Sequence, residues 1–477
     1  MPALRRFASA ALLAAAACSA LAQEALPPGV AQALAAARIP AAGVAVVVHE
    51  VGAPRASLSL NAATPMNPAS VMKLVTTLAG LELLGPAYRW RTDAYAAGAL
   101  REDVLQGDLV LKGYGDPRLT FESFWLLLRA LRDRGLREVR GDLVLDRSYF
   151  EPAPHDAARF DAEPLRPYNV GPDALLLSFK AVRFQFVPDA ERGKVIVSAQ
   201  PRPEPLEVVS VLRLSNGPCG DWREKLRADY RFAGAAAGRM RALFTGEYAA
   251  SCGERNWNVS LLSHPEFVGG VFRQLWPELG GALAGGVREG RVPEEAKLVY
   301  SHESAPLAEI VRDINKFSNN VMARQLYLTL GAEAARPPAS NIKSFAAVRA
   351  WLAQKGLEMP ELVIENGSGL SRIERISAHN LAALLLAAFR SPVMPEFVSS
   401  LPLVAVDGTL RKRMKGDAVA GQAHLKSGTL AEVRAWGGYV LDRAGRRHAL
   451  AMIVNHPAAG QAQPALEALL RWVYEQG

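Results

Sequence analysis

Ser70 stands three residues before Lys73, a spacing that could make a serine hydroxyl reactive. The apolar residues within 71–84 have helical spacing and stop at a Gly-Pro pair, so Ser70 is predicted to lie at the beginning of a helix. Side chains three residues apart emerge on the same face of a helix, and a nearby amine can take the proton of an attacking hydroxyl. The pair could therefore be a nucleophile and its base.

The order of further polar segments distinguishes this pair from a chance match. Ser340 and Lys343 repeat the same spacing, where a helix cap followed by a surface lysine is the plain interpretation. Three polar segments occur in the order Ser70 to Lys73, Ser318-Asn319-Asn320 and Lys426-Ser427-Gly428-Thr429. Ser340 does not fit this series because it follows the second segment. The series resembles the order Ser-x-x-Lys, Ser-Asp-Asn, Lys-Thr-Gly of β-lactamases and penicillin-binding proteins.

Taken together, these motifs resemble one subgroup, the low-molecular-mass class C penicillin-binding proteins of peptidase family S13, which are D-Ala-D-Ala carboxypeptidases and endopeptidases. Residues 366–372 and 407–410 are similar to that family too, and the likeness covers essentially the whole chain after residue 22. The resemblance implies an α/β fold: a serine β-lactamase/transpeptidase-like domain, with an antiparallel sheet flanked by helices, and a large, mostly β insertion.

The resemblance also implies catalytic roles. Ser70 would be acylated, Lys73 would accept its proton, and Ser318 would relay a proton to the leaving amine. For Lys73 to act as a base near neutral pH, burial and the nearby cation Lys426 must lower its pKa. The backbone N–H groups of Ser70 and Thr429 would form the oxyanion hole.

The same resemblance implies that four residues bind the substrate. Asn320 would hold the substrate peptide or Lys73. Lys426, with Ser427 and Thr429 beside it, would bind the substrate carboxylate. Ser427 replaces the usual Thr of the third motif and Asn319 the usual Asp of the second, so these changes bear on substrate preference more than on chemistry.

Both ends of the chain are predicted to contribute strands and a helix to one sheet. The middle of the chain, in contrast, alternates strand-like runs with Gly, Pro and Asp turns, and only 122–135 is predicted to be helical there. We expect strands at 44–48, 56–60, 423–425, 433–441 and 448–454, and helices at 30–37, 71–84, 305–316, 321–330, 345–354, 380–389 and 464–474.

This pattern predicts a catalytic domain made of residues 23–92 and 300–477. Residues 93–299 form the mostly β insertion, large enough for one or two small domains. Cys219 and Cys252 lie in the insertion, and in an exported protein an even pair of this kind favours a disulfide over two reduced, buried thiols.

Residues 1–22 resemble a cleaved export signal, with Arg5 and Arg6 before an apolar run and Ala-Leu-Ala at its end. Cys18 lies in this segment, but the three alanines before it disfavour a lipid anchor. No later apolar run is long enough to span a membrane, so we expect a periplasmic protein with at most peripheral membrane association.

Composition narrows the possible partners. The chain of 477 residues is 50% hydrophobic and carries a formal net charge of +8, which suits anionic envelope polymers without a cluster suited to nucleic acid. Its 8 histidines show no metal-ligand spacing, and we expect no metal or cofactor. Peptidoglycan and muropeptides are the expected partners, with β-lactams as covalent inhibitors; a β-lactamase-type hydrolase and a non-catalytic wall-binding scaffold are the alternatives.

Overall fold

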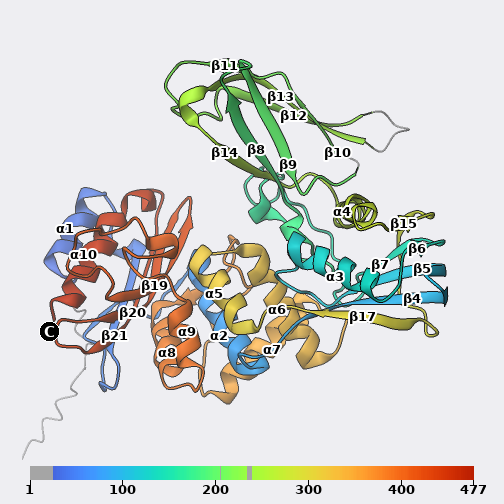
Figure 1. Cartoon of the computed structure of the whole chain (residues 1–477). Helices are drawn as coiled ribbons and strands as arrows, with labels where there is room; N and C mark the ends of the chain where they lie inside the picture. The colour runs from blue at the N-terminus through green and yellow to red at the C-terminus, as the bar shows by residue number, and fades with distance from the viewer. Residues whose placement is uncertain (1–24, 205, 234–238, 477) are drawn as a thin grey trace, which may run out of the picture.

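The computed structural model of the chain describes residues 25–204, 206–233 and 239–476. Its two ends meet at one side of the molecule, and the residues between them extend to the other side and the top of Figure 1. The expected export signal, residues 1–22, lies outside the described residues, as does Cys18. Among the helices that the structure describes, none has both the length and the apolar character that a membrane span requires.

Strands from both ends of the chain form one antiparallel sheet, as the sequence predicts. The strand order is β19-β20-β21-β1-β2, so β1 lies between β2 and β21. Val44 and Val46 of β1 pack in one hydrophobic cluster, whereas Ala45 and Val47 pack in another, which means that both faces of the sheet are covered. The strands are β1 (Val44–Glu50), β2 (Leu58–Leu60), β19 (Ala423–Leu430), β20 (Val433–Leu441) and β21 (Arg447–Asn455).

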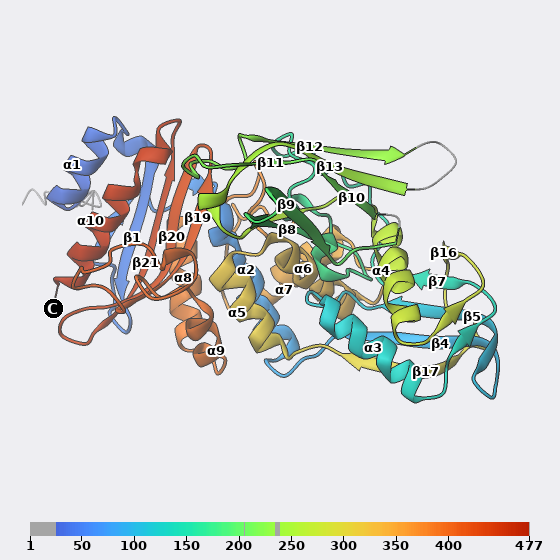
Figure 2. The same ribbon diagram turned by 45° about the horizontal axis from the view of Figure 1, so that its top comes forward.

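Helices form a layer on each face of this sheet (Figures 1 and 2). α1 and α10 pack together on one face, while α8 contacts β1 and β21 on the other. α2 packs beside α5, α6 and α7, in the layer that lies on the α8 side. These helices are α1 (Pro28–Ala36), α2 (Lys73–Leu84), α5 (Leu307–Phe317), α6 (Asn320–Ala335), α7 (Asn341–Gln354), α8 (Ala378–Phe389), α9 (Met394–Ser400) and α10 (Gln463–Tyr474).

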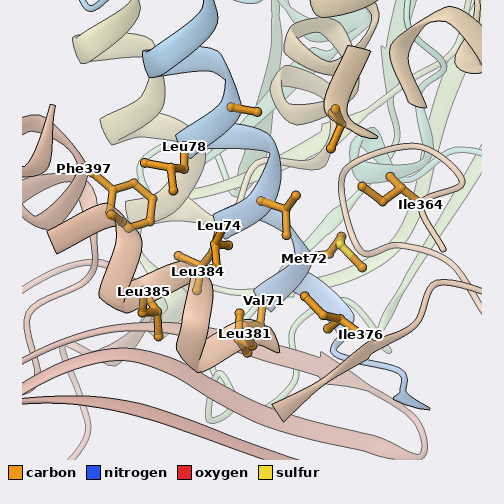
Figure 3. Close-up of a cluster of buried hydrophobic side chains, with 14 of the residues drawn as sticks. Val71, Met72, Leu74, Leu78, Ile364, Ile376, Leu381, Leu384, Leu385 and Phe397 are labelled. Atoms are coloured by element: carbon orange, nitrogen blue, oxygen red, sulfur yellow. The ribbon is translucent and has the colours of Figure 1, made fainter. Parts of the chain in front are cut away.

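Apolar contacts fix α2 and the turn before it. Figure 3 shows Val71, Leu74 and Leu78 in one cluster with Leu381 and Leu384 of α8, and all of these side chains are buried. Residues 73–81 of α2 are all buried, so this part of the helix cannot turn or slide without losing apolar burial, and a single buried leucine is worth roughly 1.5–3 kcal/mol. The first turn of α2 is therefore a rigid platform for polar side chains.

The middle of the chain forms two further sheets, as expected for a mostly β insertion. One has the order β15-β6-β5-β4-β17 with β7 and β16 attached, and the other has the order β10-β13-β11-β9-β8-β14 with β12 attached. They comprise β4 (Arg91–Arg101), β5 (Val104–Gly113), β6 (Glu138–Val139), β7 (Leu143–Asp146), β8 (Val182–Asp189), β9 (Lys194–Gln200), β10 (Leu206–Ser210), β11 (Arg213–Ser215), β12 (Leu226–Ala233), β13 (Arg239–Ala249), β14 (Arg255–Val259), β15 (Ala282–Leu283), β16 (Val287–Glu289) and β17 (Lys297–Glu303). A separate short pair joins β3 (Pro65–Met66) to β18 (Ile376–Ser377).

One prediction for the insertion is wrong. The helix expected at 122–135 is present as α3 (Phe121–Asp133), but a second helix, α4 (His264–Glu278), also occurs there. Ser263 caps it, and a reciprocal bond with Glu266 completes a capping box. This signature is visible in the sequence, but the Gly269-Gly270 pair and the later Pro277 weaken the helical pattern around it.

The ends of the insertion pair with each other. β4 and β17 run antiparallel, with Arg91 opposite Glu303, so the expected divisions after residues 92 and 299 fall inside these two strands. We therefore propose that the inserted region begins at Arg91 and ends at Glu303. The expected disulfide between Cys219 and Cys252 is present, with a Cα separation of 4.8 Å, and it joins the segment between β11 and β12 to the turn between β13 and β14.

Candidate active site

Ser70 lies in a tight turn, Ala69–Met72, that leads directly into α2. Two glycines from distant segments press against this turn. A Cβ atom at Gly369 would lie 2.0 Å from the Ala69 carbonyl oxygen, and one at Gly428 would lie 2.4 Å from the Pro68 carbonyl oxygen. Because no side chain fits at either place, the glycines allow the strand β19 and the 366–371 loop to close around the serine.

Lys73 connects the serine to two other segments. Its Nζ donates to Ser70 Oγ at 3.0 Å and to Asn320 Oδ1 at 2.6 Å, and it also donates to the carbonyl oxygen of Ser368. An ammonium has three hydrogens, and all of them are used here. On losing one proton, the amine could accept a hydrogen bond from Ser70 in place of donating one, which is the geometry that a general base needs.

The surroundings of Lys73 lower the pKa of its amine well below that of a free lysine. Burial is the largest cause, since the side chain is 0% exposed, and the charge of Lys426 is the next. The carboxylate of Glu374 acts in the opposite direction and raises this pKa. The two causes expected from the sequence, burial and Lys426, are thus the leading ones.

The second motif joins two helices. Ser318 ends α5 with φ of 56°, a left-handed conformation that non-glycine residues rarely adopt. Its side chain is half-buried and is not part of the hydrophobic core. Asn319 caps α6, where its Oδ1 accepts from the N–H of Met322 at 3.1 Å. Asn319 therefore caps the helix, whereas Ser318 and Asn320 on either side of it line a cleft that Ser70 also lines.

Lys426 of the third motif lies behind the wall of the cleft. Its side chain is 0% exposed, and its Nζ donates to Ser318 Oγ and to the Ser427 carbonyl oxygen, both at 2.8 Å. Burial lowers the pKa of Lys426 to about 7. Ser427 Oγ lies 2.8 Å from Thr409 Oγ1, so the serine that replaces threonine in this motif has a hydroxyl partner from the 407–410 segment.

A single cleft brings the motif residues together. The residues that line it are Ser70, Ser318, Asn320, Ser427 and Thr429. Lys73 and Lys426 are fully buried behind this lining and donate to Ser70 and Ser318, respectively. Ser70 lies in the first turn of a helical segment, where backbone N–H groups lack intrahelical acceptors. Such an N–H, together with one from the adjacent strand β19, can stabilise an oxyanion that forms on a bound carbonyl group.

One buried acid in this site gave no sequence signal. Glu374 is 0% exposed, and its Oε1 accepts from the N–H groups of Glu365, Asn366 and Gly367 at 3.1, 3.0 and 3.2 Å. The carbonyl oxygen that Lys73 contacts belongs to the next residue, Ser368. A lone glutamate in a loop has no motif, so sequence reasoning could not distinguish it from a surface charge.

Ser340 and Lys343, the second Ser-x-x-Lys match in the sequence, lie outside this cluster, and so does Arg372 of the 366–372 segment. Ser340 caps α7, accepting from the N–H of Lys343, and Lys343 donates to backbone carbonyl groups nearby, which confirms the helix-cap interpretation. Arg372 lines a neighbouring pocket, donates to the carbonyl oxygen of Phe160 at 3.1 Å and lies 4.9 Å from the centre of its ring.

Comparison with known proteins agrees with this geometry. A model of the D-Ala-D-Ala carboxypeptidase 3 (S13) family matches residues 27–473. A D-alanyl-D-alanine carboxypeptidase of Actinomadura sp. (strain R39) is 29% identical over 443 residues, covering 88% of this chain and 79% of that protein.

Solved structures show the same fold. Penicillin-binding protein 4 (dacB) from Haemophilus influenzae superposes with a TM-score of 0.76 at 20% identity, covering 94% of this chain and 99% of that one. A predatory endopeptidase of Bdellovibrio bacteriovorus, acylated by penicillin G and in complex with an immunity protein, superposes with a TM-score of 0.52 at 16% identity, covering 90% of this chain and 91% of that one. The order of motifs and the fold thus point to one family.

Proposed function

This chain belongs to the D-Ala-D-Ala carboxypeptidase 3 (S13) family and is an enzyme of that type, and we propose that it works through an acyl-enzyme on Ser70. The observation that carries the proposal is the 3.0 Å contact between Lys73 Nζ and Ser70 Oγ inside the cleft. The substrates would be peptidoglycan stem peptides that end in D-Ala-D-Ala, and cross-linked muropeptides would be cleaved in the same way.

In the proposed reaction, neutral Lys73 takes the Ser70 proton as Oγ attacks the carbonyl carbon of the penultimate D-alanine. The negative charge that develops on the carbonyl oxygen is stabilised by the N–H groups of Ser70 and Thr429. Ser318, held by Lys426, passes a proton to the leaving amine, and D-alanine departs. Water then attacks the carbonyl carbon of the ester and gives one proton to Ser318, and Lys73 returns its proton to Ser70 Oγ as the acyl group leaves.

Asn320 and the third motif would hold the peptide. Asn320 Oδ1 already accepts from Lys73, so its amide nitrogen is the group left to donate to a substrate carbonyl oxygen. We also propose that β-lactams acylate Ser70 and that residues 1–22 export the protein to the periplasm, where its substrate lies. Because the anionic wall surrounds such an enzyme, its basic net charge would favour association with the polymer.

Mass spectrometry tests the central step. We expect benzylpenicillin to add to the purified protein once, on the peptide that contains Ser70, and we expect D-alanine to be released from a pentapeptide ending in D-Ala-D-Ala. Ser70→Ala should lose both reactions, whereas Ser340→Ala, which changes only a helix cap, should keep them. An adduct on another serine would overturn the assignment of the nucleophile.

The same experiment separates the alternatives. A penicilloyl adduct that disappears within seconds would indicate a β-lactamase, since such an enzyme must deacylate the antibiotic quickly. A folded protein that neither reacts with penicillin nor releases D-alanine would indicate a wall-binding scaffold.

The pH dependence of acylation should depend on Glu374. Its carboxylate raises the pKa of Lys73, so Glu374→Gln should lower that pKa and make the neutral amine available at lower pH. We expect the acid limb of the acylation rate to move to lower pH by roughly half a unit or more. Glu365→Gln, in the same loop but half-buried and paired with Arg159, is the matched control and should leave the limb in place. Equal profiles for both variants would show that Glu374 only supports the loop.

A further inference from the structure

The catalytic cleft has an uneven distribution of charge. Its charged lining residues are Arg413 and Arg434 near the third motif, and Asp161 elsewhere in the lining. Asp161 is already engaged, since it accepts from the hydroxyl of Tyr168 at 2.8 Å and from the side-chain amide of Asn169 at 2.7 Å. A substrate that enters along the third motif therefore meets guanidinium groups.

Arg434 lies beside the third motif because of strand register. β19 and β20 pair antiparallel, with Thr429 directly opposite Arg434. Residues opposite each other in this way project from the same face of the sheet, with Cβ atoms about 4.5–5.5 Å apart. The Arg434 Nη1 donates to the carbonyl oxygens of Leu430 at 2.7 Å and Val433 at 2.8 Å, which fixes the guanidinium at the turn between the strands. Among the residues that the structure describes, Nη2 and Nε of Arg434 have no hydrogen-bond partner, so this edge can donate to a ligand.

The positive charge of this pair is not balanced by a nearby acid. Burial and Arg413, in that order, lower the pKa of Arg434, so the two guanidinium groups act on each other. Within the described residues, 25–204, 206–233 and 239–476, neither arginine has a carboxylate at ion-pair distance. Two cations kept close without an acid favour a bound anion, and a planar guanidinium suits a carboxylate because it can donate two parallel hydrogen bonds.

Lys426 does not supply this charge at the cleft surface. Its Nζ is directed to Ser318 and to a backbone carbonyl oxygen, and the side chain is fully buried. On the same wall, Ser427 and Thr429 line the cleft with hydroxyl groups that can donate to an anion. A ligand carboxylate next to Thr429 would therefore find hydroxyl donors and the free edge of Arg434 together.

We propose that Arg434, with Arg413 beside it, binds the terminal carboxylate of the substrate peptide next to Thr429. This inference rests on the proposed function and names the group by which the cleft selects substrates with a free C-terminal carboxylate. Arg434 would be a specificity-determining residue, since it holds the end of the peptide while the chemistry takes place at Ser70.

The test compares two peptides that differ in one group. An Nα-acetylated peptide ending in D-Ala-D-Ala is prepared as the free acid and as the C-terminal amide, and its binding to the full chain carrying Ser70→Ala is measured by calorimetry. A hydrogen-bonded charge pair is worth about 1.5–3 kcal/mol, so adding Arg434→Gln should weaken binding of the acid by about ten- to a hundredfold. Binding of the amide should change by less than about twofold. Arg413→Gln should have a smaller effect in the same direction.

Lys412→Gln is the matched control, because Lys412 is an exposed cation of the same segment that does not line the cleft. It should leave both affinities unchanged. In the active enzyme, Arg434→Gln should raise the KM for the free acid and leave kcat nearly constant. Equal weakening of acid and amide, or no weakening, would overturn the proposal. If the unmodified chain binds the acid but releases no D-alanine, the proposed function fails, while the binding comparison still decides the role of Arg434.

Discussion

Replacing Lys73 by methionine should remove acylation of Ser70 and leave the fold in place. The methionine side chain has a similar length and suits a fully buried position, but it carries neither the amine nor its charge. General-base catalysis contributes about 10²- to 10⁴-fold, and we expect the second-order rate of reaction with a labelled penicillin to fall by that amount. Stopped-flow or gel fluorescence of the labelled protein measures this rate directly.

The chain offers a matched control for this substitution. Lys343 occupies the same place after Ser340 that Lys73 occupies after Ser70, but its Nζ donates to the carbonyl oxygens of Arg336 and Pro338 at the surface. The Lys343→Met variant should therefore react with the labelled penicillin at the normal rate. If Lys73→Met unfolds, Lys73→Gln tests the same point with a polar side chain that can keep a bond to Asn320 or Ser368. Labelling at the normal rate by a folded Lys73 variant would exclude a lysine base.

The parts of the fold that the sequence predicts are those with local signatures. The strands near both termini show runs of β-branched and apolar residues, and their pairing in one sheet follows from the need to cover both faces. The three motifs can be predicted from their order together with the element on which each is expected to lie. Ser70 begins a helix, Ser318 ends one, and Lys426 lies on a strand.

The contacts between these motifs depend on segments that carry no signature. The Ser368 carbonyl oxygen is a backbone group, so no residue type marks it as a partner of Lys73. Glu374 raises the pKa of Lys73 through its charge, and its buried position near that amine follows from the packing of the whole domain. The role of Asn319 as a helix cap and the burial of Lys426 likewise depend on how α6 and β19 are placed by distant residues.

The backbone of Gly369 lies directly against the backbone of the turn that carries Ser70. This residue has φ of 77°, and a Cβ atom there would lie 2.0 Å from the Ala69 carbonyl oxygen and 2.7 Å from the Ser70 Cα. Gly369→Ala should therefore displace the turn that carries the nucleophile. Since a shift of about 1 Å can cost 10²-fold in rate, we expect penicillin labelling to fall by about a hundredfold or more.

Gly356→Ala separates this contact from ordinary backbone strain. Gly356 also has a positive φ, 68°, but nothing lies within 4 Å of the position that its Cβ would occupy. Both alanines carry the cost of a left-handed conformation, about 1–2 kcal/mol in the free energy of unfolding, which thermal denaturation can compare. Only Gly369→Ala should lose labelling as well. Equal labelling by the two variants would mean that the loop yields to the new methyl group without moving Ser70, and the 366–371 loop would then not position the nucleophile.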